Sequence, residues 1–248
     1  SQVQMAKGNF APTPVSVGDL FAGALLPGIL LVSLYLSYVL FKAATAPASC
    51  PATPVPADEK SQLVRDFFVA LVPPLLLILA VLGSILGGIA TPTEAASVGA
   101  VGAMVLAALR WRLSFRILRE TMIATATITS MVFIILLGAS VFSIVFRMMG
   151  GDNLVHEFLS NLPGGTLAAV GVVMIIMFFL GFILDTFEII FIVIPITAPV
   201  LLMLDVDPIW LGVLVGVNLQ TSFLTPPFGF ALFYLRGVAP ADLPTSAI

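Results

Sequence analysis

The chain has 248 residues, of which 60% are hydrophobic and 9% charged, and its formal net charge is −3. Soluble globular domains carry about 25% charged residues, so this chain has too little polar surface for a fold surrounded by water. The acidic balance excludes the basic surface that nucleic acids need. One cysteine and one histidine exclude an intramolecular disulfide and a His-rich metal centre. The composition predicts an integral membrane protein. We do not expect an enzyme of the Ser-His-Asp kind, because the single histidine, His156, lies in a polar loop and the chain has no Gly-x-Ser-x-Gly motif to partner it.

Four apolar runs are expected to cross the membrane once each, and they are 20–41, 67–89, 95–109 and 121–146. At about 1.5 Å per residue, three of them reach the roughly 30 Å of a hydrocarbon core, whereas 95–109 spans only about 22 Å. A Pro-rich linker, 42–62, separates the first two runs. We expect Pro73-Pro74 to kink the second run near its start, because proline removes a helix hydrogen bond.

The third run is expected to begin at a helix cap and to end at a basic cluster. In Thr91-Pro-Thr-Glu94, Thr91 would cap the helix, Pro92 would take its first position and Glu94 would close a capping box. The residues that follow the run include Arg110, Arg112, Arg116 and Arg119. This cluster predicts a basic amphipathic segment at a membrane surface.

Two acidic residues interrupt the next apolar stretch, in which 167–184 and 189–204 flank Asp185-Thr-Phe-Glu188. One interpretation is an ordinary turn between two spanning helices, with both carboxylates in water. The other is the tip of a re-entrant hairpin, with Asp185 and Glu188 lining a wet cavity as substrate-binding residues. We favour the hairpin, because acids at membrane depth are costly and usually functional.

The last run, 209–235, is expected to break within Asn218–Gly229, because Pro226 and Pro227 cannot donate to a helix ladder. Backbone carbonyls freed in this way are hard oxygen ligands suited to Na⁺. The side chains of Asn218, Gln220 and Thr221 are candidates to meet a polar or anionic substrate. The alternative is a proline kink that serves packing alone.

Charge gives an orientation. With the four single crossings and a hairpin that enters and leaves by one face, Lys42, Lys60, Arg65, the arginine cluster and Arg236 share one side. By the positive-inside rule this side is cytoplasmic. The other side holds Asp152, Glu157, Asp205 and Asp207, with Lys7 and Arg147 as the basic exceptions.

Three motifs together resemble a known family, and they are Gly87-Gly-Ile-Ala-Thr-Pro-Thr-Glu-Ala-Ala, Gly181-Phe-Ile-Leu-Asp-Thr-Phe-Glu-Ile and Asn218-Leu-Gln-Thr-Ser-Phe-Leu-Thr-Pro-Pro-Phe-Gly. The chain is similar, from about Val15 to Thr245, to the large membrane subunit of tripartite ATP-independent periplasmic (TRAP) transporters. The resemblance is to DctM-like subunits of the mannitol/chloroaromatic or dicarboxylate branch. Members carry a preceding inverted repeat and a further C-terminal span, so the chain resembles the second half of a longer subunit.

The resemblance implies an all-α polytopic protein of the bacterial inner membrane, built as one inverted repeat of an elevator-type transporter. Its parts would be a lead-in, scaffold helix and cytoplasmic linker (1–66), membrane helices (67–149), and the hairpin, unwound helix and cytoplasmic tail (150–248). No cofactor is implied, and Na⁺ is the coupling ion. A sodium site is implied at Gly181, Ser222, Thr225 and Phe228.

The implied partners are a small TRAP membrane subunit, a periplasmic substrate-binding protein, a small organic solute and the lipid bilayer. The function implied is sodium-coupled import of a small organic acid or related solute. Two other classes remain: a structural subunit that does not transport, and a membrane-embedded enzyme that uses Asp185 and Glu188. These two acids, three residues apart, would share a helix face, but no nucleophile or metal ligand accompanies them.

Overall fold

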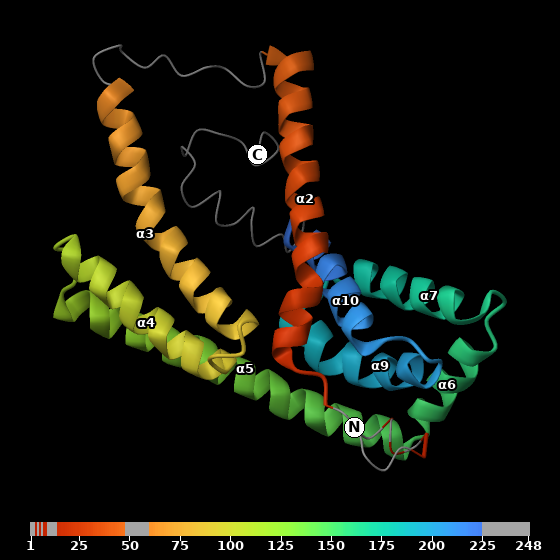
Figure 1. Ribbon diagram of the computed structural model, residues 1–248. Coiled ribbons are helices and arrows are strands. Elements are labelled where there is room, and N and C mark those ends of the chain that lie inside the picture. The colour runs from red at the N-terminus through yellow and green to blue at the C-terminus, as the bar shows by residue number, and fades with distance from the viewer. Residues whose placement is uncertain (1–2, 4, 6, 9–13, 48–59, 225–248) are drawn as a thin grey trace. The chain divides into compact units, whose positions relative to one another are not determined.

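The computed structural model describes residues 3, 5, 7–8, 14–47 and 60–224, although nothing is said of the side chains at 60–61, 63–64 and 221–224. These described residues form helices and no strand (Figure 1). Among them, five helices are long and apolar enough to cross a membrane: Val17–Thr45, Arg65–Leu86, Pro92–Leu109, Phe115–Met148 and Thr186–Met203. The prediction of an all-α polytopic membrane protein is confirmed.

The chain divides into two compact units, one of residues 16–122 and the other of 1–15 with 123–248. The first contains α2 (Val17–Thr45), α3 (Lys60–Leu86), α4 (Pro92–Leu109) and the start of α5 (Phe115–Met148). Ser16 and Asp19 form a capping box at the beginning of α2, and no residue of α2 is buried. An apolar helix that is exposed all round is the form expected of a segment whose solvent is lipid.

An arginine at the end of α4 donates hydrogen bonds to α3 beside its two adjacent prolines. Pro73 and Pro74 lie inside the helix, where they leave the carbonyls of Val69 and Ala70 without the N–H groups that normally reach back four residues. The Arg110 guanidinium donates from Nη2 to Val69 O at 2.6 Å and to Ala70 O at 3.3 Å. A cationic side chain therefore replaces the two hydrogen bonds that the prolines removed.

Small residues let α3 and α4 lie close together. A Cβ placed on Gly102 would stand 2.4 Å from Leu77 Cδ1, and one on Gly99 would stand 3.2 Å from Val81 Cγ2. Ala95, one turn earlier on α4, is 1% exposed. Lipid provides no hydrophobic drive for helix association, so close packing of this kind and the Arg110 hydrogen bonds are what hold the pair.

The start of α4 confirms the predicted cap and corrects the predicted length. Thr91 N donates to Glu94 Oε2 at 2.8 Å, and Glu94 N donates to Thr91 Oγ1 at 3.4 Å, so the capping box is complete with Pro92 next to it. Because the cap starts the helix at Pro92 and not at residue 95, α4 reaches about 27 Å. It therefore qualifies by length and composition as a span, in agreement with the single crossing expected for 95–109.

The arginine cluster is not one amphipathic segment, which corrects that prediction. Arg110 ends α4, Arg112 lies in the connection, and Arg116 and Arg119 belong to the first turns of α5. The connection is a Schellman turn in which Trp111 has φ 54° and the N–H of Arg112 donates to Ala107 O at 2.9 Å. Trp111 is 95% exposed, as an aromatic residue at a membrane–water interface would be.

The second unit has the larger core. It contains the rest of α5 followed by α6 (Gly151–Ser160), α7 (Gly165–Leu180), α8 (Thr186–Glu188), one π-helical turn η2 (Ile189–Val193), α9 (Ile194–Met203) and α10 (Pro208–Leu224). Figure 1 shows α6, α7, α9 and α10 gathered in one bundle. The core side chains with the least exposure are Ala169, Val173, Met177, Ile189 and Leu201. They belong to α7, η2 and α9, so the two limbs of the hairpin supply the most deeply buried side chains of this core.

The last helix is continuous as far as the structure describes it, and the two prolines that are expected to break it lie beyond that part. Residues 218–224, the first part of Asn218–Gly229, continue α10 without interruption, and residues 225–229 lie outside the described residues. Proline removes donors only at its own position, so Pro226 and Pro227 affect the carbonyls of residues 222 and 223 and nothing earlier. Asn218 and Gln220 therefore lie on a helix.

Candidate functional site

The tip between the two hairpin limbs is shaped by its own acidic residues. After α7 ends, Asp185 takes the cap position of the next helix and its Oδ1 accepts the N–H of Thr186 at 2.6 Å. Glu188 Oε2 accepts the N–H of Asp185 at 3.3 Å, which closes a capping box. Both side chains are partly buried. The two predicted site residues are thus brought together, and each already satisfies a backbone donor of the tip.

A π-helical turn and two prolines follow the cap. In η2 the N–H of Ile194 donates to Ile189 O, five residues back. Pro195 and Pro199 come next, and neither has an N–H for the carbonyls of Phe191 and Pro195. Turns of this kind inside helices are frequent at functional sites, because they leave carbonyls free and re-aim side chains.

Asn218 joins α10 to the first limb of the hairpin. Its Nδ2 donates to Met174 O at 3.0 Å, and both groups are partly buried. Met174 lies about two turns before Gly181, the last cap residue of α7, so the contact is with the body of the limb. This hydrogen bond joins α10 to α7, and the substrate contact predicted for Asn218 stays a prediction.

The remaining predicted site residues fall into three groups, according to how far the structure describes them. Gly181 is buried at the end of α7 with ordinary helical φ of −62°, and Gln220 is exposed on α10. Thr221 and Ser222 lie in the last turns of α10, and nothing is described of their side chains. Thr225 and Phe228 lie outside the described residues. The sodium ligands and the substrate contacts therefore stay predictions.

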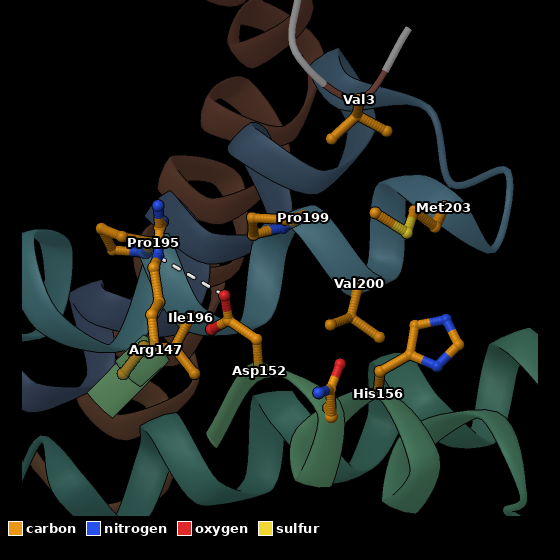
Figure 2. Close-up of a pocket in the computed structure, with 10 residues that line it drawn as sticks. Val3, Arg147, Asp152, His156, Pro195, Ile196, Pro199, Val200 and Met203 are labelled. Carbon is orange, nitrogen blue, oxygen red and sulfur yellow. Dashed lines mark ion pairs between the residues drawn. The ribbon is translucent and has the colours of Figure 1, made fainter. Parts of the chain in front are cut away.

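A pocket of about 510 Å³, which the sequence argument missed, lies between α6 and α9. One wall is polar and consists of Arg147, Asp152, Asn153 and His156; the other is apolar and includes Pro195, Ile196, Pro199, Val200 and Met203 (Figure 2). No predicted site residue within the described part of the chain lines it. The available signal was the Pro195–Pro199–Met203 spacing, which puts three side chains on one helix face.

Both basic exceptions to the predicted orientation are neutralised. Lys7 Nζ pairs with Asp205 Oδ1, and Arg147 Nε lies 3.4 Å from Asp152 Oδ2. Each basic group therefore has an acidic partner among the residues that were placed on the same side. Because both are paired, Lys7 and Arg147 add no net positive charge to the side that the positive-inside rule makes periplasmic. The orientation itself stays a prediction.

The capping box at the tip makes a testable prediction. Asp185→Ser keeps an oxygen that can cap and removes the charge, whereas Asp185→Ala removes both. We expect Ala to lower stability by about 1 kcal/mol and Ser to lower it much less, because serine caps nearly as well as aspartate. Thermal unfolding of the detergent-solubilised protein measures the difference, and Thr91→Ala in the capping box of α4 is a matched comparison with an expected loss of the same size. If Ser is as damaging as Ala, the charge and not the cap is what the tip needs.

Comparison with known proteins gives a consistent answer along almost the whole chain. The family described as "Tripartite ATP-independent periplasmic transporter, DctM component" matches residues 7–247. The chain is 31% identical over 235 residues to the C4-dicarboxylate TRAP transporter large permease protein DctM of Pseudomonas aeruginosa, covering 94% of this chain and 54% of that protein. It is 27% identical over 239 residues to the sialic acid TRAP transporter large permease protein SiaM of Vibrio cholerae, covering 92% and 52%.

A third relative is the isethionate TRAP transporter permease protein DctMQ of Oleidesulfovibrio alaskensis, which is 27% identical over 229 residues, covering 92% of this chain and 35% of that protein. The chain spans about half the length of the large permease relatives it matches. The family match and the five apolar helices make it a multi-pass protein of the bacterial inner membrane. Because the family match covers residues 7–247, nearly the whole sequence, this chain belongs to the DctM component family of tripartite ATP-independent periplasmic transporters.

Proposed function

We propose that this chain forms part of the large permease subunit of a secondary transporter that imports a small organic acid with Na⁺. A periplasmic binding protein delivers the solute, and a small membrane subunit accompanies the permease. Family membership supports these roles. The observation that carries the proposal is the hairpin: α7 reaches only about 24 Å, short of a full crossing, and α9 packs back against it. A limb of that length suits a re-entrant segment at a solute path.

Sodium coupling is supported by the chemistry of adjacent prolines. Pro226-Pro227 remove the donors for the carbonyls of Ser222 and Phe223, just as Pro73-Pro74 do for Val69 and Ala70. In α3 a cationic guanidinium occupies the freed pair. We propose that Na⁺ does so near the end of α10, with Gly181, Ser222, Thr225 and Phe228 as ligands.

Substrate recognition is proposed for the polar face of α10, with Gln220 and Thr221 as the contact residues, while Asn218 positions α10 against α7. Asp185 and Glu188 are proposed to serve recognition through the shape of the tip, since two carboxylates placed directly against an organic acid would repel it. Their engagement in the capping box also speaks against the enzyme alternative, which needs both as free acids.

Reconstitution tests the proposal directly. The assembled transporter, with its full-length large subunit, small subunit and binding protein, is placed in liposomes and solute uptake is measured under an inward Na⁺ gradient. We expect uptake with Na⁺ and none when K⁺ replaces it. Pro227→Ala restores one helix donor and is expected to shift the Na⁺ dependence to at least about tenfold higher concentration. If uptake by the unaltered protein is the same with Na⁺ and with K⁺, the proposed sodium coupling is refuted.

A further inference from the structure

The pocket between α6 and α9 has the size and the two-sided lining of a ligand site. Its volume, about 510 Å³, is within the roughly 300–1,000 Å³ of small-molecule sites. Figure 2 shows Asp152 and His156 on the α6 side and Pro199 and Val200 on the α9 side, and Val3 of the N-terminal segment also lines the pocket. Among the described residues, none of those proposed for substrate or sodium lines it, so the proposed function does not use it.

The polar wall is electrically balanced. Arg147 contributes one positive charge and Asp152 one negative charge, with Nε and Oδ2 3.4 Å apart. Asn153 and His156 add an amide and an imidazole from the same helix. The N-terminus of α6 begins at Gly150, where no side chain caps the first backbone N–H groups. A ligand that meets this wall finds one positive and one negative partner side by side.

The apolar wall runs the length of α9. Pro195, Pro199 and Met203 stand four residues apart and form one stripe, and Ile196 and Val200 form the next. None of the five side chains can donate or accept a strong hydrogen bond. This wall therefore suits the hydrocarbon and glycerol part of an amphiphile and offers nothing to a fully polar solute.

The pocket lies where a membrane-spanning helix gives way to an interfacial one. Arg147 is in the last turn of α5, and α6 begins four residues after it. On α6, Leu154 and Phe158 are 71% and 54% exposed one turn apart, next to the face that Gly151 and Leu159 bury. Exposed apolar side chains beside polar ones are typical of a helix that lies in the boundary between head groups and acyl chains.

From these four observations we propose that the α6–α9 pocket binds the head group of a zwitterionic phospholipid, phosphatidylethanolamine. The phosphate lies against Arg147 and the first N–H groups of α6, and the ammonium lies against Asp152. The glycerol and the beginning of the acyl chains follow the α9 stripe. Because the wall has no net charge, an anionic lipid without an ammonium group leaves the Asp152 carboxylate facing a phosphate and binds more weakly.

Native mass spectrometry of the assembled transporter, delipidated and solubilised in detergent, measures lipid binding and so tests the proposal. Phosphatidylethanolamine or phosphatidylglycerol is added back, and the apparent affinity is taken from the lipid-bound fraction. Asp152→Asn is expected to lower the affinity for phosphatidylethanolamine about tenfold and to raise that for phosphatidylglycerol, since the ammonium loses its partner and the phosphate loses a repulsion. Arg147→Gln is expected to lower both.

Two further variants keep the result interpretable. Ile196→Trp fills the apolar side without touching the ion pair and is expected to lower the affinity for both lipids, whereas Glu157→Gln, on α6 but outside the pocket lining, should change neither. Equal binding of the two lipids to the unaltered protein, or an Asp152→Asn variant that keeps its lipid preference, would overturn the proposal. So would full competition by soluble phosphorylethanolamine, because the pocket would then take a free solute. Since uptake is not the readout, failure here leaves sodium-coupled transport untouched.

Discussion

Asn218→Asp is expected to be the most damaging of the single changes considered, lowering stability by roughly 3 kcal/mol. The exchange is nearly isosteric, yet it turns an N–H donor into a carboxylate oxygen that faces the Met174 carbonyl 3.0 Å away in a partly buried position. Two acceptors cannot share a hydrogen bond, and the charge has little water around it. Asn218→Leu only removes the donor and is expected to cost about 1 kcal/mol. Thermal unfolding of the detergent-solubilised transporter gives both values.

A matched control separates this positioning role from substrate binding. Gln220→Glu makes the same amide-to-acid change on the same helix, at an exposed side chain, and should leave stability unchanged. If Asn218 served only the substrate, Asn218→Asp and Gln220→Glu would both impair uptake and neither would alter unfolding. A stable Asn218→Asp protein would therefore contradict the interhelical role.

The second large effect is expected at Arg110, and it should depend on residues some forty positions earlier. Arg110→Leu leaves the Val69 and Ala70 carbonyls without donors at the end of a membrane helix, which we expect to cost about 2 kcal/mol. In a Pro73→Ala, Pro74→Ala background the new N–H groups satisfy those carbonyls within α3. Arg110→Leu should then cost only a few tenths of a kcal/mol.

The coupling is measured as a double-mutant cycle on unfolding midpoints, with both prolines treated as one site. Arg112→Leu is the control, because Arg112 lies in the same connection but donates to neither carbonyl. If Arg110→Leu is equally costly with and without the prolines, the guanidinium acts through packing or through lipid head groups. A coupling energy of at least about 1 kcal/mol is what replacement of lost backbone donors requires.

Features set by a few neighbouring residues could be predicted from the sequence. Thr91-Pro-Thr-Glu94 caps α4 as expected, because a capping box needs only residues three apart and a proline that fits the first turn. The apolar runs likewise predict α2, α3 and α5, because a chain in lipid must make its backbone hydrogen bonds within each segment. The DctM family, too, follows from three motifs and is confirmed.

Features that join distant residues could not. Nothing local in the arginine cluster distinguishes Arg110, whose acceptors lie about forty residues away, from its neighbours. The pocket needs α6 and α9 to meet, although its two walls are unremarkable in the sequence. The hydrogen bond from Asn218 to the Met174 carbonyl is of the same kind, because its acceptor lies 44 residues earlier in the chain.

The π turn in η2 fixes which way α9 faces. Each residue of an α-helix advances the helix by about 100°, and a π turn holds one residue more than an α turn of the same length. Removal of one residue from 189–193 would therefore leave both limbs nearly as long, but rotate α9 by about that angle around its own axis. The stripe from Pro195 to Met203 would swing away from α6, and other residues would take its place. A deletion of one codon here would change which residues of α9 face α6 and would keep the order and number of the helices. Length variation in this turn is therefore a means of exchanging the face that α9 presents to α6.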